Sequence, residues 1–287
     1  MKKLLYQFDT DTHPSVFDNV VGYDGGADHI SAYGSVNAAN AGGLVEGAIF
    51  TRAPKDKKNT AIFIGGSNLP QGEAVLAATL AKFFGKFRVS IMFDCNGSNT
   101  TAAAAVAWLS HGRNLRGKRA VVLAGSGPVG QRAALLLARE GAQVAVTGRK
   151  HAVVRAAADA LKKRIGMDIE AIEAPTNIAR AKSLEGAQIV LATGASGITL
   201  LEAKDWQDNP SLELIADANA SPPAGIDGVG LSDRSTLSHG KILFGALGFG
   251  ALKLALHRAC IARLFEQNDL LLDAEEIYAI AKGMVGT

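Results

Sequence analysis

The segment with the clearest chemical meaning is a glycine run that follows an apolar stretch. It is Val121-Val-Leu-Ala-Gly125-Ser-Gly127-Pro-Val-Gly130, with G-x-G-x-x-G spacing. The first glycine of such a run permits a tight turn, the second lets the backbone approach a pyrophosphate, and the third lets helix and strand pack closely. A helix that begins there directs free N–H groups and its positive dipole at the phosphates. The alternative is a glycine-rich turn without a ligand. The strand before the run and the helix after it favour a dinucleotide site, whose predicted residues are Gly125, Ser126, Gly127, Pro128, Val129 and Gly130.

The end of the next apolar run indicates which dinucleotide is bound. Sites for NAD place Asp or Glu there to bind the ribose 2′-OH. This chain instead has Thr147-Gly-Arg149-Lys150, two cations and no carboxylate. The planar guanidinium of Arg149 can clamp a 2′-phosphate, and Lys150 adds a point charge. The alternative is a solvated pair at a helix start, where cations are unfavourable. The sequence therefore favours NADP over NAD.

Two later apolar runs end in small or polar residues that could border the nicotinamide. Thr193-Gly-Ala195 follows one run, and Asp217-Ala-Asn219 ends the next. The carboxyl ends of strands gather around the crevice of a doubly wound sheet. Ordinary turn chemistry is the alternative. The predicted cofactor contacts here are Thr193, Gly194, Ala195 and Asn219.

Two polar, glycine-rich segments of the first hundred residues are candidates for binding a substrate. They span residues 18–29 and 94–101. Short polar side chains in loops can bind a heterocycle rich in N–H and C=O groups. A flexible turn is the alternative for the first segment, and a helix N-cap for the second. The predicted substrate-binding residues are Tyr23, Asp24, Gly25, His29, Asn96, Gly97, Ser98, Asn99, Thr100 and Thr101.

These segments need a scaffold of alternating strands and helices to position them. The first series predicts strands at 3–8, 29–33, 60–64 and 88–93, and helices at 15–21, 37–50, 70–84 and 99–110. A polar, basic stretch follows at 111–119. The second series predicts strands at 120–124, 143–147, 169–172, 189–192 and 212–216, and helices at 128–140, 151–165, 178–184, 246–265 and 273–282. This rhythm predicts an α/β fold with mostly parallel sheets. It divides into a βα domain over 1–112 and a Rossmann-type domain over 113–245.

Composition excludes several other classes of protein. The chain has 287 residues, which suggests one large domain or two modest ones at about 150 residues each. Its 48% hydrophobic content and net charge of +3 argue against disorder and against a dedicated nucleic-acid binder. The two cysteines, Cys95 and Cys260, form no metal-ligand spacing, so no metal is predicted. With no signal peptide or membrane span, the predicted location is the cytoplasm.

Over nearly its full length the chain resembles the NADP-dependent methylene-tetrahydromethanopterin dehydrogenases of methylotrophic bacteria, which also oxidise methylene-tetrahydrofolate. The motifs that carry the resemblance are Gln7-Phe-Asp-Thr-Asp11, Val21-Gly-Tyr-Asp-Gly-Gly-Ala-Asp-His29, residues 94–101, the glycine run, Gly148-Arg-Lys150 and Gly245-Ala-Leu-Gly-Phe-Gly-Ala-Leu-Lys253 with Leu256-His-Arg-Ala-Cys260. The resemblance implies oxidation of methylene to methenyl in one-carbon metabolism. It also implies a pterin in a deep cleft between two domains, the first completed by helices in 246–287, and a homo-oligomer, a trimer or a multiple of it.

The reaction that the resemblance implies makes modest demands on side chains. The donor carbon lies between two nitrogens, so hydride loss leaves an amidinium-like cation, and no proton must move in that step. A carboxylate near the ring system could favour the cation, and Asp18, Asp24 and Asp94 are the candidates. Lys253 and His257 lie one helical turn apart, where Lys253 could bind a polar edge of the pterin or steer its acidic tail. Solvated helix residues are the alternative. The predicted catalytic residues are Asp18, Asp94 and Lys253, and His257 joins the substrate-binding set.

Two other functions remain open at this point. An NADP-dependent dehydrogenase of the shikimate type oxidises an alcohol and needs a base, typically a lysine–aspartate pair. The polar loops of the first domain hold no lysine that would serve. A protein that only senses NADP would keep the glycine run and Arg149, but it would not need the polar segment 94–101.

Overall fold

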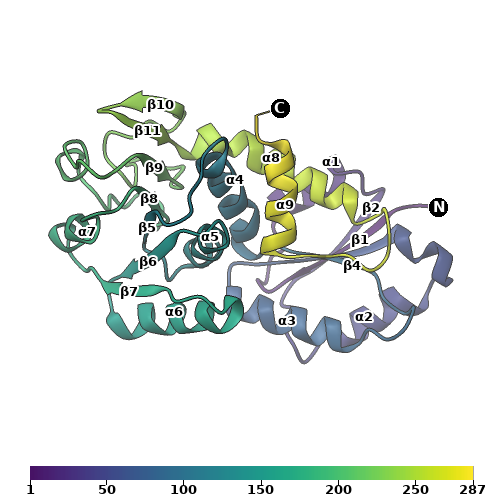
Figure 1. Cartoon of the computed structure of the whole chain (residues 1–287). Helices are drawn as coiled ribbons and strands as arrows, with labels where there is room; N and C mark the ends of the chain where they lie inside the picture. Colours follow the sequence, from purple (N-terminus) through teal and green to yellow (C-terminus); the bar gives the residue numbers. More distant parts are fainter. Residues whose placement is uncertain (287) are drawn as a thin grey trace. The chain divides into compact units, whose positions relative to one another are not determined.

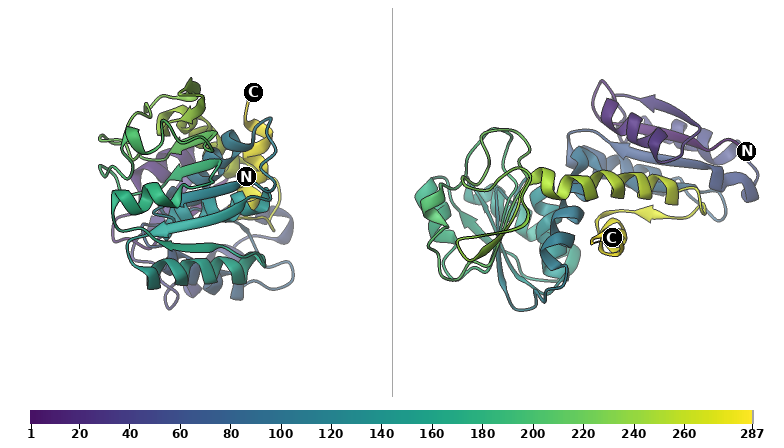
Figure 2. Two further views of the ribbon diagram at one scale, coloured as in Figure 1. Left: turned by 60° about the vertical axis from the view of Figure 1, so that its left-hand side comes forward. Right: turned by 90° about the horizontal axis from the view of Figure 1, so that it is seen from above.

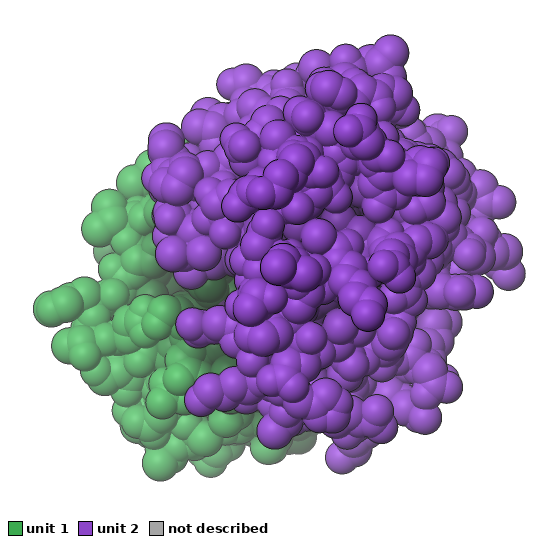
Figure 3. All heavy atoms as spheres, turned by 90° about the vertical axis from the view of Figure 1, so that its left-hand side faces the viewer, with its two compact units in different colours: residues 1–100, 254–280 green, residues 101–253, 281–287 purple. Residues whose placement is uncertain are grey.

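The computed structural model describes residues 1–286 and divides into two compact units, coloured separately in Figure 3. Unit 1 comprises residues 1–100 and 254–280. Unit 2 comprises residues 101–253 together with the described residues from 281 onward. Both units are α/β, as the sequence predicts. The chain passes between the units inside three helices: α4 (Ser98–Ser110), α8 (Ala246–Arg263) and α9 (Ala274–Met284).

The division differs from the boundary expected after residue 112. It falls after Thr100, because the later part of α4 packs within unit 2. There the rings of Trp108 and Phe244 have centroids 6.3 Å apart. At the other end, only residues 254–280 of the expected segment 246–287 complete unit 1.

Unit 1 is built on a five-stranded parallel sheet with the order β12-β4-β3-β1-β2 (Figure 1). Since every strand pair is parallel, all carboxyl ends lie at one edge of the sheet and all amino ends at the other. The two-residue strand β12 was not expected from the sequence, because it is too short to give a pattern. The elements are β1 (Leu4–Asp9), α1 (Val16–Asp24), β2 (His29–Tyr33), α2 (Ala41–Phe50), η1 (Pro54–Asn59), β3 (Thr60–Gly65), α3 (Leu69–Ala81), β4 (Ser90–Phe93), η2 (Cys95–Gly97) and β12 (Leu271–Leu272).

The two faces of this sheet are covered by different helices. Phe8, Ile62 and Ile64 belong to a buried apolar cluster with residues of α2 and α3. Side chains alternate between faces along a strand, so Gln7 and Phe63 point to the other side. There the Gln7 amide donates to the Ser15 carbonyl at the start of α1, and Phe63 packs on α8. Burial of both faces explains why β3 and β4 are continuously apolar.

Unit 2 is built on a seven-stranded sheet with the order β10-β11-β9-β8-β5-β6-β7. Six strands are parallel, and β10 pairs antiparallel with β11 at one edge. The parallel strands have the order of the doubly wound dinucleotide-binding fold, with its switch point between β5 and β8. The elements are β5 (Arg119–Leu123), α5 (Pro128–Arg139), β6 (Gln143–Gly148), α6 (His151–Ile165), β7 (Glu170–Glu173), α7 (Asn177–Ser183), β8 (Ile189–Ala192), η3 (Ala203–Asp205), β9 (Leu214–Asp217), β10 (Arg234–Ser238) and β11 (Lys241–Phe244).

The helices expected in this half are present and pack as the fold requires. Helix α5 packs on β5 and β6, and α6 runs along β6 and β7 (Figure 2). The β10–β11 hairpin was not predicted, because β10 is a largely exposed edge strand. None of the helices within residues 1–286 is both long and apolar enough to cross a membrane.

Candidate functional site

The glycine run forms a tight turn between β5 and α5. Ala124 has a positive φ of 54°, and the Gly125 N–H donates to the Thr147 carbonyl of β6 at 2.9 Å. A Cβ on Gly125 would lie 2.8 Å from the Val146 Cβ, and one on Gly130 would lie 2.6 Å from the Gly125 Cα. Neither position can carry a side chain without moving the backbone or a neighbouring strand. The geometry gives both glycines the packing roles that the spacing predicts.

Gly127 is different, because the space around it is open. A Cβ there would meet only the Ala124 carbonyl, at 3.6 Å. Gly127 is the N-cap of α5, and within the described residues 1–286 this helix start has no side-chain cap hydrogen bond. Free N–H groups beside an open glycine form a site for an anion. The residues therefore fit a pyrophosphate.

The polar turn before α4 looks similar in sequence but is already filled. One oxygen of Asp94 accepts the N–H groups of Asn99 and Thr100 at 2.8 and 3.1 Å, and the other accepts the Thr100 hydroxyl at 2.7 Å. Asp94 is 1% exposed. The carboxylate of the chain thus occupies the position that a bound anion would take at this helix. Of the two turns, only that of α5 is open.

The end of β6 presents two cations beside a second open helix start. Arg149 and Lys150 are exposed, and neither side chain is held by a hydrogen bond or an ion pair within residues 1–286. Lys150 is the N-cap of α6, which has no side-chain cap and no acidic residue in its first turn. A Cβ on Gly148 would lie 3.4 Å from the Ser126 hydroxyl oxygen, so this hydroxyl lies beside the strand end. Two cations, a hydroxyl and free helix N–H groups fit a phosphate.

Two of the predicted cofactor contacts after β8 and β9, Thr193 and Asn219, use their side chains in hydrogen bonds within unit 2. The Thr193 hydroxyl donates to the Leu123 carbonyl at 2.9 Å, which ties β8 to the glycine turn. The Asn219 side chain donates to the Pro223 carbonyl at 3.0 Å and accepts the Ser221 N–H at 3.1 Å. Gly194 and Ala195 lie between these positions in partly or fully exposed turns. The backbone of these loops remains available to a ligand, whereas the Thr193 and Asn219 side chains shape the loops.

The carboxyl edge of unit 1 holds a loop pair that sequence reasoning missed. The Asp11 carboxylate accepts the Ser67 N–H at 3.0 Å and the Ser67 hydroxyl at 2.8 Å. Asp9, 1% exposed, accepts the N–H groups of Asp11 and Ser15, both at 2.9 Å. The signal was present, because both Asp-Thr-Asp and Gly-Gly-Ser-Asn directly follow an apolar strand. These loops surround the end of β1 and β3.

Aromatic rings and ionisable groups meet beside this loop pair. His257 of α8 is 1% exposed and stacks on Phe63, with centroids 5.5 Å apart and planes at 25°. Phe17 lies 6.2 Å from the same imidazole and is itself 49% exposed. Asp18, half-buried in the first turn of α1, has an oxygen 3.5 Å from a Cβ built on Gly65. Asp18 and His257 are thus brought to one face of the sheet, and Phe17 is an addition that the sequence analysis did not make.

Comparison with known proteins assigns the chain to a family. Residues 16–96 match the family described as methylene-tetrahydromethanopterin dehydrogenase, N-terminal. The chain is 54% identical over 285 residues to the bifunctional protein MdtA of Methylorubrum extorquens, with 99% of each chain covered. It is 32% identical over 295 residues to the NAD(P)-dependent methylenetetrahydromethanopterin dehydrogenase of the same organism, again with 99% of each covered. The chain belongs to the methylene-tetrahydromethanopterin dehydrogenase family. The predicted resemblance is confirmed.

Solved structures share the fold of this family member at low identity. Quinate dehydrogenase from Corynebacterium glutamicum in complex with NAD matches with a TM-score of 0.56 at 14% identity, over 97% of this chain and 98% of that one. Shikimate 5-dehydrogenase from Listeria monocytogenes, in complex with shikimate and NAD, matches with a TM-score of 0.53 at 12% identity, over 97% and 96%. These likenesses confirm the fold class and say nothing of the substrate.

One predicted part of the substrate site lies at the other edge of the unit 1 sheet from the loops after β1, β3 and β4. Tyr23, Asp24, Gly25 and His29 connect the end of α1 to the start of β2, so they lie at the amino edge of the sheet. Asp24 forms an ion pair with Arg258 at 2.8 Å, and a Cβ on Gly25 would lie 2.6 Å from the Ile261 Cβ. The segment packs α1 on α8 at the edge opposite to Asn96. The role expected for Asp24 in stabilising the cation stays a prediction.

The second predicted segment separates into buried and accessible residues. Asp94, Ser98, Asn99 and Thr100 are at most 1% exposed, and the Asn99 amide donates to Asp273 at 3.0 Å. Their side chains build the turn, and the catalytic role expected for Asp94 stays a prediction. The predicted residues Asn96 and Gly97 stay accessible at this edge, whereas Thr101 is half-buried and is the first residue of unit 2. His257 is likewise a buried histidine and not the solvated one that was considered, while Lys253, one turn earlier on α8, is half-buried.

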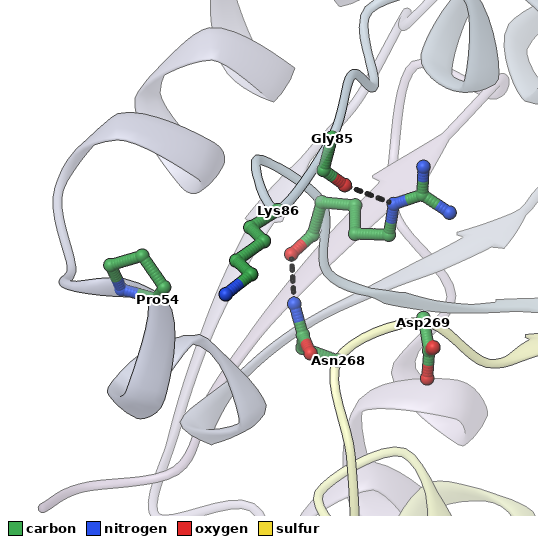
Figure 4. A pocket seen from close by; sticks show the side chains of 6 residues that line it. Pro54, Gly85, Lys86, Asn268 and Asp269 are labelled. Carbon is green, nitrogen blue, oxygen red and sulfur yellow. Dashed lines mark hydrogen bonds between the residues drawn. The ribbon is translucent and has the colours of Figure 1, made fainter.

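A pocket of about 400 Å³ in unit 1 lies away from these residues (Figure 4). Its lining precedes β3, β4 and β12, so the pocket lies at the amino edge of the sheet. The Arg88 Nε donates to the Gly85 carbonyl and the Asn268 amide donates to the Arg88 carbonyl, both at 3.0 Å. The second bond joins the segment before β4 to the segment before β12. The lining residues are Pro54, Gly85, Lys86, Arg88, Asn268 and Asp269.

Proposed function

We propose that this chain is an NADP-dependent oxidoreductase that converts methylene-tetrahydromethanopterin reversibly to the methenyl form, and that it also accepts methylene-tetrahydrofolate. Membership of the dehydrogenase family supports the substrate class. The observation that carries the cofactor is the open start of α5 beside the unbonded cations at the end of β6. NADP, more than NAD, matches that arrangement, because the 2′-phosphate gives Arg149 and Lys150 an anionic partner.

The chain would hold the cofactor by its backbone and these cations. The N–H groups at the start of α5 bind the pyrophosphate, and Gly127 leaves space for it. Arg149, Lys150 and the Ser126 hydroxyl bind the 2′-phosphate. When bound, NADP supplies a nicotinamide C4 that accepts the hydride. The turns after β8 and β9 border the nicotinamide half and exclude water from it.

In unit 1, the proposed substrate residues are those that stay accessible at the carboxyl edge. Phe17 offers an exposed aromatic face, and Asp18 a half-buried carboxylate. A carboxylate near the ring system favours the cationic product. Asn96 supplies a polar contact. Thr101 and Lys253, which belong to unit 2, stay predictions from the sequence. No proton is transferred in the hydride step, so the residues orient the substrate and need no acid–base pair.

The proposal includes a setting for the enzyme. We expect a cytoplasmic homo-oligomer that works in one-carbon metabolism of the methylotrophic type, without nucleic acid, membrane or metal. Both cysteines are buried free thiols, which fits a reducing compartment. Sedimentation of the purified full chain would test the oligomeric state.

The deciding experiment follows absorbance at 340 nm with each pterin and each cofactor. Methylene-tetrahydromethanopterin and methylene-tetrahydrofolate are combined in turn with NADP and NAD. Reduction of NADP with either pterin, and much less of NAD, is expected. No reduction with any pair, from protein that still binds NADP, would overturn the proposal.

The two alternatives predict other outcomes of the same assay. An alcohol dehydrogenase of the shikimate type would reduce NADP with shikimate and with neither pterin. A sensor would bind NADP and reduce it with no substrate. Substitution of Asn96 and Thr101 separates them further, since these side chains are proposed to contact the pterin but not the cofactor. Unchanged KM for the pterin in both variants would remove them from the site.

A further inference from the structure

Asp217 is a buried carboxylate at the carboxyl end of β9, and it accepts hydrogen bonds from both ends of the following loop. It is 2% exposed. One oxygen accepts the Asn219 N–H at 3.0 Å, and the other accepts the Ile226 N–H at 3.1 Å. A Cβ on Gly225 would lie 2.6 Å from the first oxygen, so the loop closes directly on the carboxylate. The loop between these contacts, residues 218–226, is thereby fixed at its start and at its end.

The loop at 218–226 is also hydrogen-bonded to the segment that follows β8. The Thr199 hydroxyl donates to the Ala224 carbonyl at 2.9 Å, and the Leu200 N–H donates to the Gly225 carbonyl at 2.7 Å. Leu201 and Ile226 form a parallel bridge. One carboxylate therefore sets the position of two successive loops at the carboxyl edge of the unit 2 sheet.

These two loops belong to the half of the sheet that faces the nicotinamide. A doubly wound sheet binds a dinucleotide across its switch point, one nucleotide on each half. Arg149 and Lys150 are on the β5-β6-β7 half, and their match to a 2′-phosphate assigns the adenosine to that half. The nicotinamide then lies at the ends of β8 and β9. This step rests on the proposed function.

We infer that Asp217 is a positioning residue for hydride transfer: it fixes the loops at 193–201 and 218–226 that hold the nicotinamide against the substrate. It does so without touching the cofactor, because the carboxylate is buried and both oxygens accept loop N–H groups. Hydride transfer is sensitive to small displacements of the reacting carbon, where about 1 Å can cost about a hundredfold in rate. A side chain that supports a reactive geometry in this way governs kcat more than binding of the distant nucleotide half.

The test compares Asp217→Asn with the unchanged chain in three measurements. They are kcat for hydride transfer, the Kd for NADP and the Kd for adenosine 2′,5′-bisphosphate, which occupies only the adenosine half. Asn keeps the shape but turns one acceptor into a donor that faces a loop N–H. We expect kcat to fall about tenfold to a hundredfold. We also expect weaker NADP binding and a Kd for the bisphosphate within about twofold.

Two further variants keep the test decisive if Asp217→Asn fails to fold. Thr199→Val removes the hydroxyl contact with the loop at 218–226 while keeping side-chain volume. It should lower kcat and leave the Kd for the bisphosphate within about twofold. Asp233→Asn is the matched control, because Asp233 also accepts a backbone N–H, that of Gly230 at 2.7 Å, outside these two loops. It should change none of the three quantities.

The outcomes separate this inference from the proposed function. A kcat within twofold of the unchanged chain for both Asp217→Asn and Thr199→Val would overturn the positioning role. Equal weakening of NADP and bisphosphate binding would also overturn it, because that result indicates general damage. If the unchanged chain binds NADP but transfers no hydride, the proposed function fails, while the ratio of the two dissociation constants still tests the position of the nicotinamide half.

Discussion

At the residue level, the proposed preference for NADP depends on Arg149. Its guanidinium is exposed at the end of β6. Arg149→Glu removes a charge-assisted contact with the 2′-phosphate and adds repulsion, so the Kd for NADP should rise about a hundredfold. The Kd for NAD, which has a 2′-OH there, should change less than about threefold. Fluorescence titration with both cofactors measures the two values.

The matched control for this prediction is Arg155→Glu on α6. Arg155 is exposed and pairs with Asp159 at 3.1 Å, so it has a similar charge without a role in the site. It should leave both dissociation constants unchanged. Equal losses of NADP and NAD affinity in Arg149→Glu would contradict the 2′-phosphate role.

Asp217 also makes a prediction about the pH dependence of stability. Burial raises the pKa of this carboxyl above its ordinary value of 3.8, against the lowering effect of its backbone hydrogen bonds. The folded chain therefore holds this proton more tightly than the unfolded chain. The stabilising contribution is complete below the ordinary value and is lost as the pH rises through the raised pKa.

Urea unfolding of the unchanged chain and of Asp217→Asn across this pH range measures the effect. The amide of the variant does not titrate in this range. The unfolding free energy of the unchanged chain should therefore fall relative to that of the variant as the pH rises. Other carboxyl groups cancel in the difference. Parallel free-energy curves for the two proteins would show that the pKa of Asp217 is the same in both states.

At the scale of elements, the turn before α5 separates a binding role from a packing role. Gly127→Ala places a methyl group in open space where the pyrophosphate is proposed to lie, so NADP affinity should fall about tenfold with unfolding free energy nearly unchanged. Gly130→Ala forces a methyl group to 2.6 Å from the Gly125 Cα. It should cost about 1–3 kcal/mol of stability. Thermal unfolding and NADP titration of both variants check the contrast, and a stable Gly130→Ala would refute the packing role.

The turn before α4 allows a similar comparison, in which one substitution should change stability and the other should change substrate binding. Asp94→Ala leaves the N–H groups of Asn99 and Thr100 unsatisfied and should cost about 2–3 kcal/mol of stability. Asn96 is exposed with a φ of 56°, a conformation that glycine also adopts. Asn96→Gly should leave stability unchanged and raise the KM for the pterin. If Asp94→Ala keeps full stability but loses kcat, the capping role assigned here is wrong and the catalytic one returns.

At the scale of the whole molecule, unit 1 is built from two distant segments of the chain. Leu264 is fully buried in the second segment, and Leu136 is fully buried in α5 of unit 2. Leu264→Ala should cost about 2–5 kcal/mol. It should speed amide hydrogen exchange in β4 and β12, which pair with each other, and leave β5 and β6 nearly unchanged. Leu136→Ala should speed exchange in β5 and β6 and leave β4 and β12 nearly unchanged. Uniform acceleration through both sheets in either variant would contradict two separately cooperative units.

The features of this protein that are local in the chain can be predicted from the residues alone. The α/β alternation, most strands and helices, the glycine turn and the cationic end of β6 all follow from contiguous patterns. They could be predicted because strand, turn and helix are adjacent, so their geometry depends on the residue types in one short stretch. Family membership followed from the same motifs, since together they are far more specific than the glycine spacing alone.

The edge of the sheet at which each polar loop lies depends on the tertiary fold. Composition is similar in residues 22–29 and 94–101, but strand direction in a parallel sheet puts the first at the amino edge and the second at the carboxyl edge. Burial then decided which polar side chains stay free, because Asp94 and Asp217 satisfy backbone N–H groups that only the fold brings near them. Contacts such as Asp11 with Ser67 join residues far apart in sequence, and chain packing alone creates them.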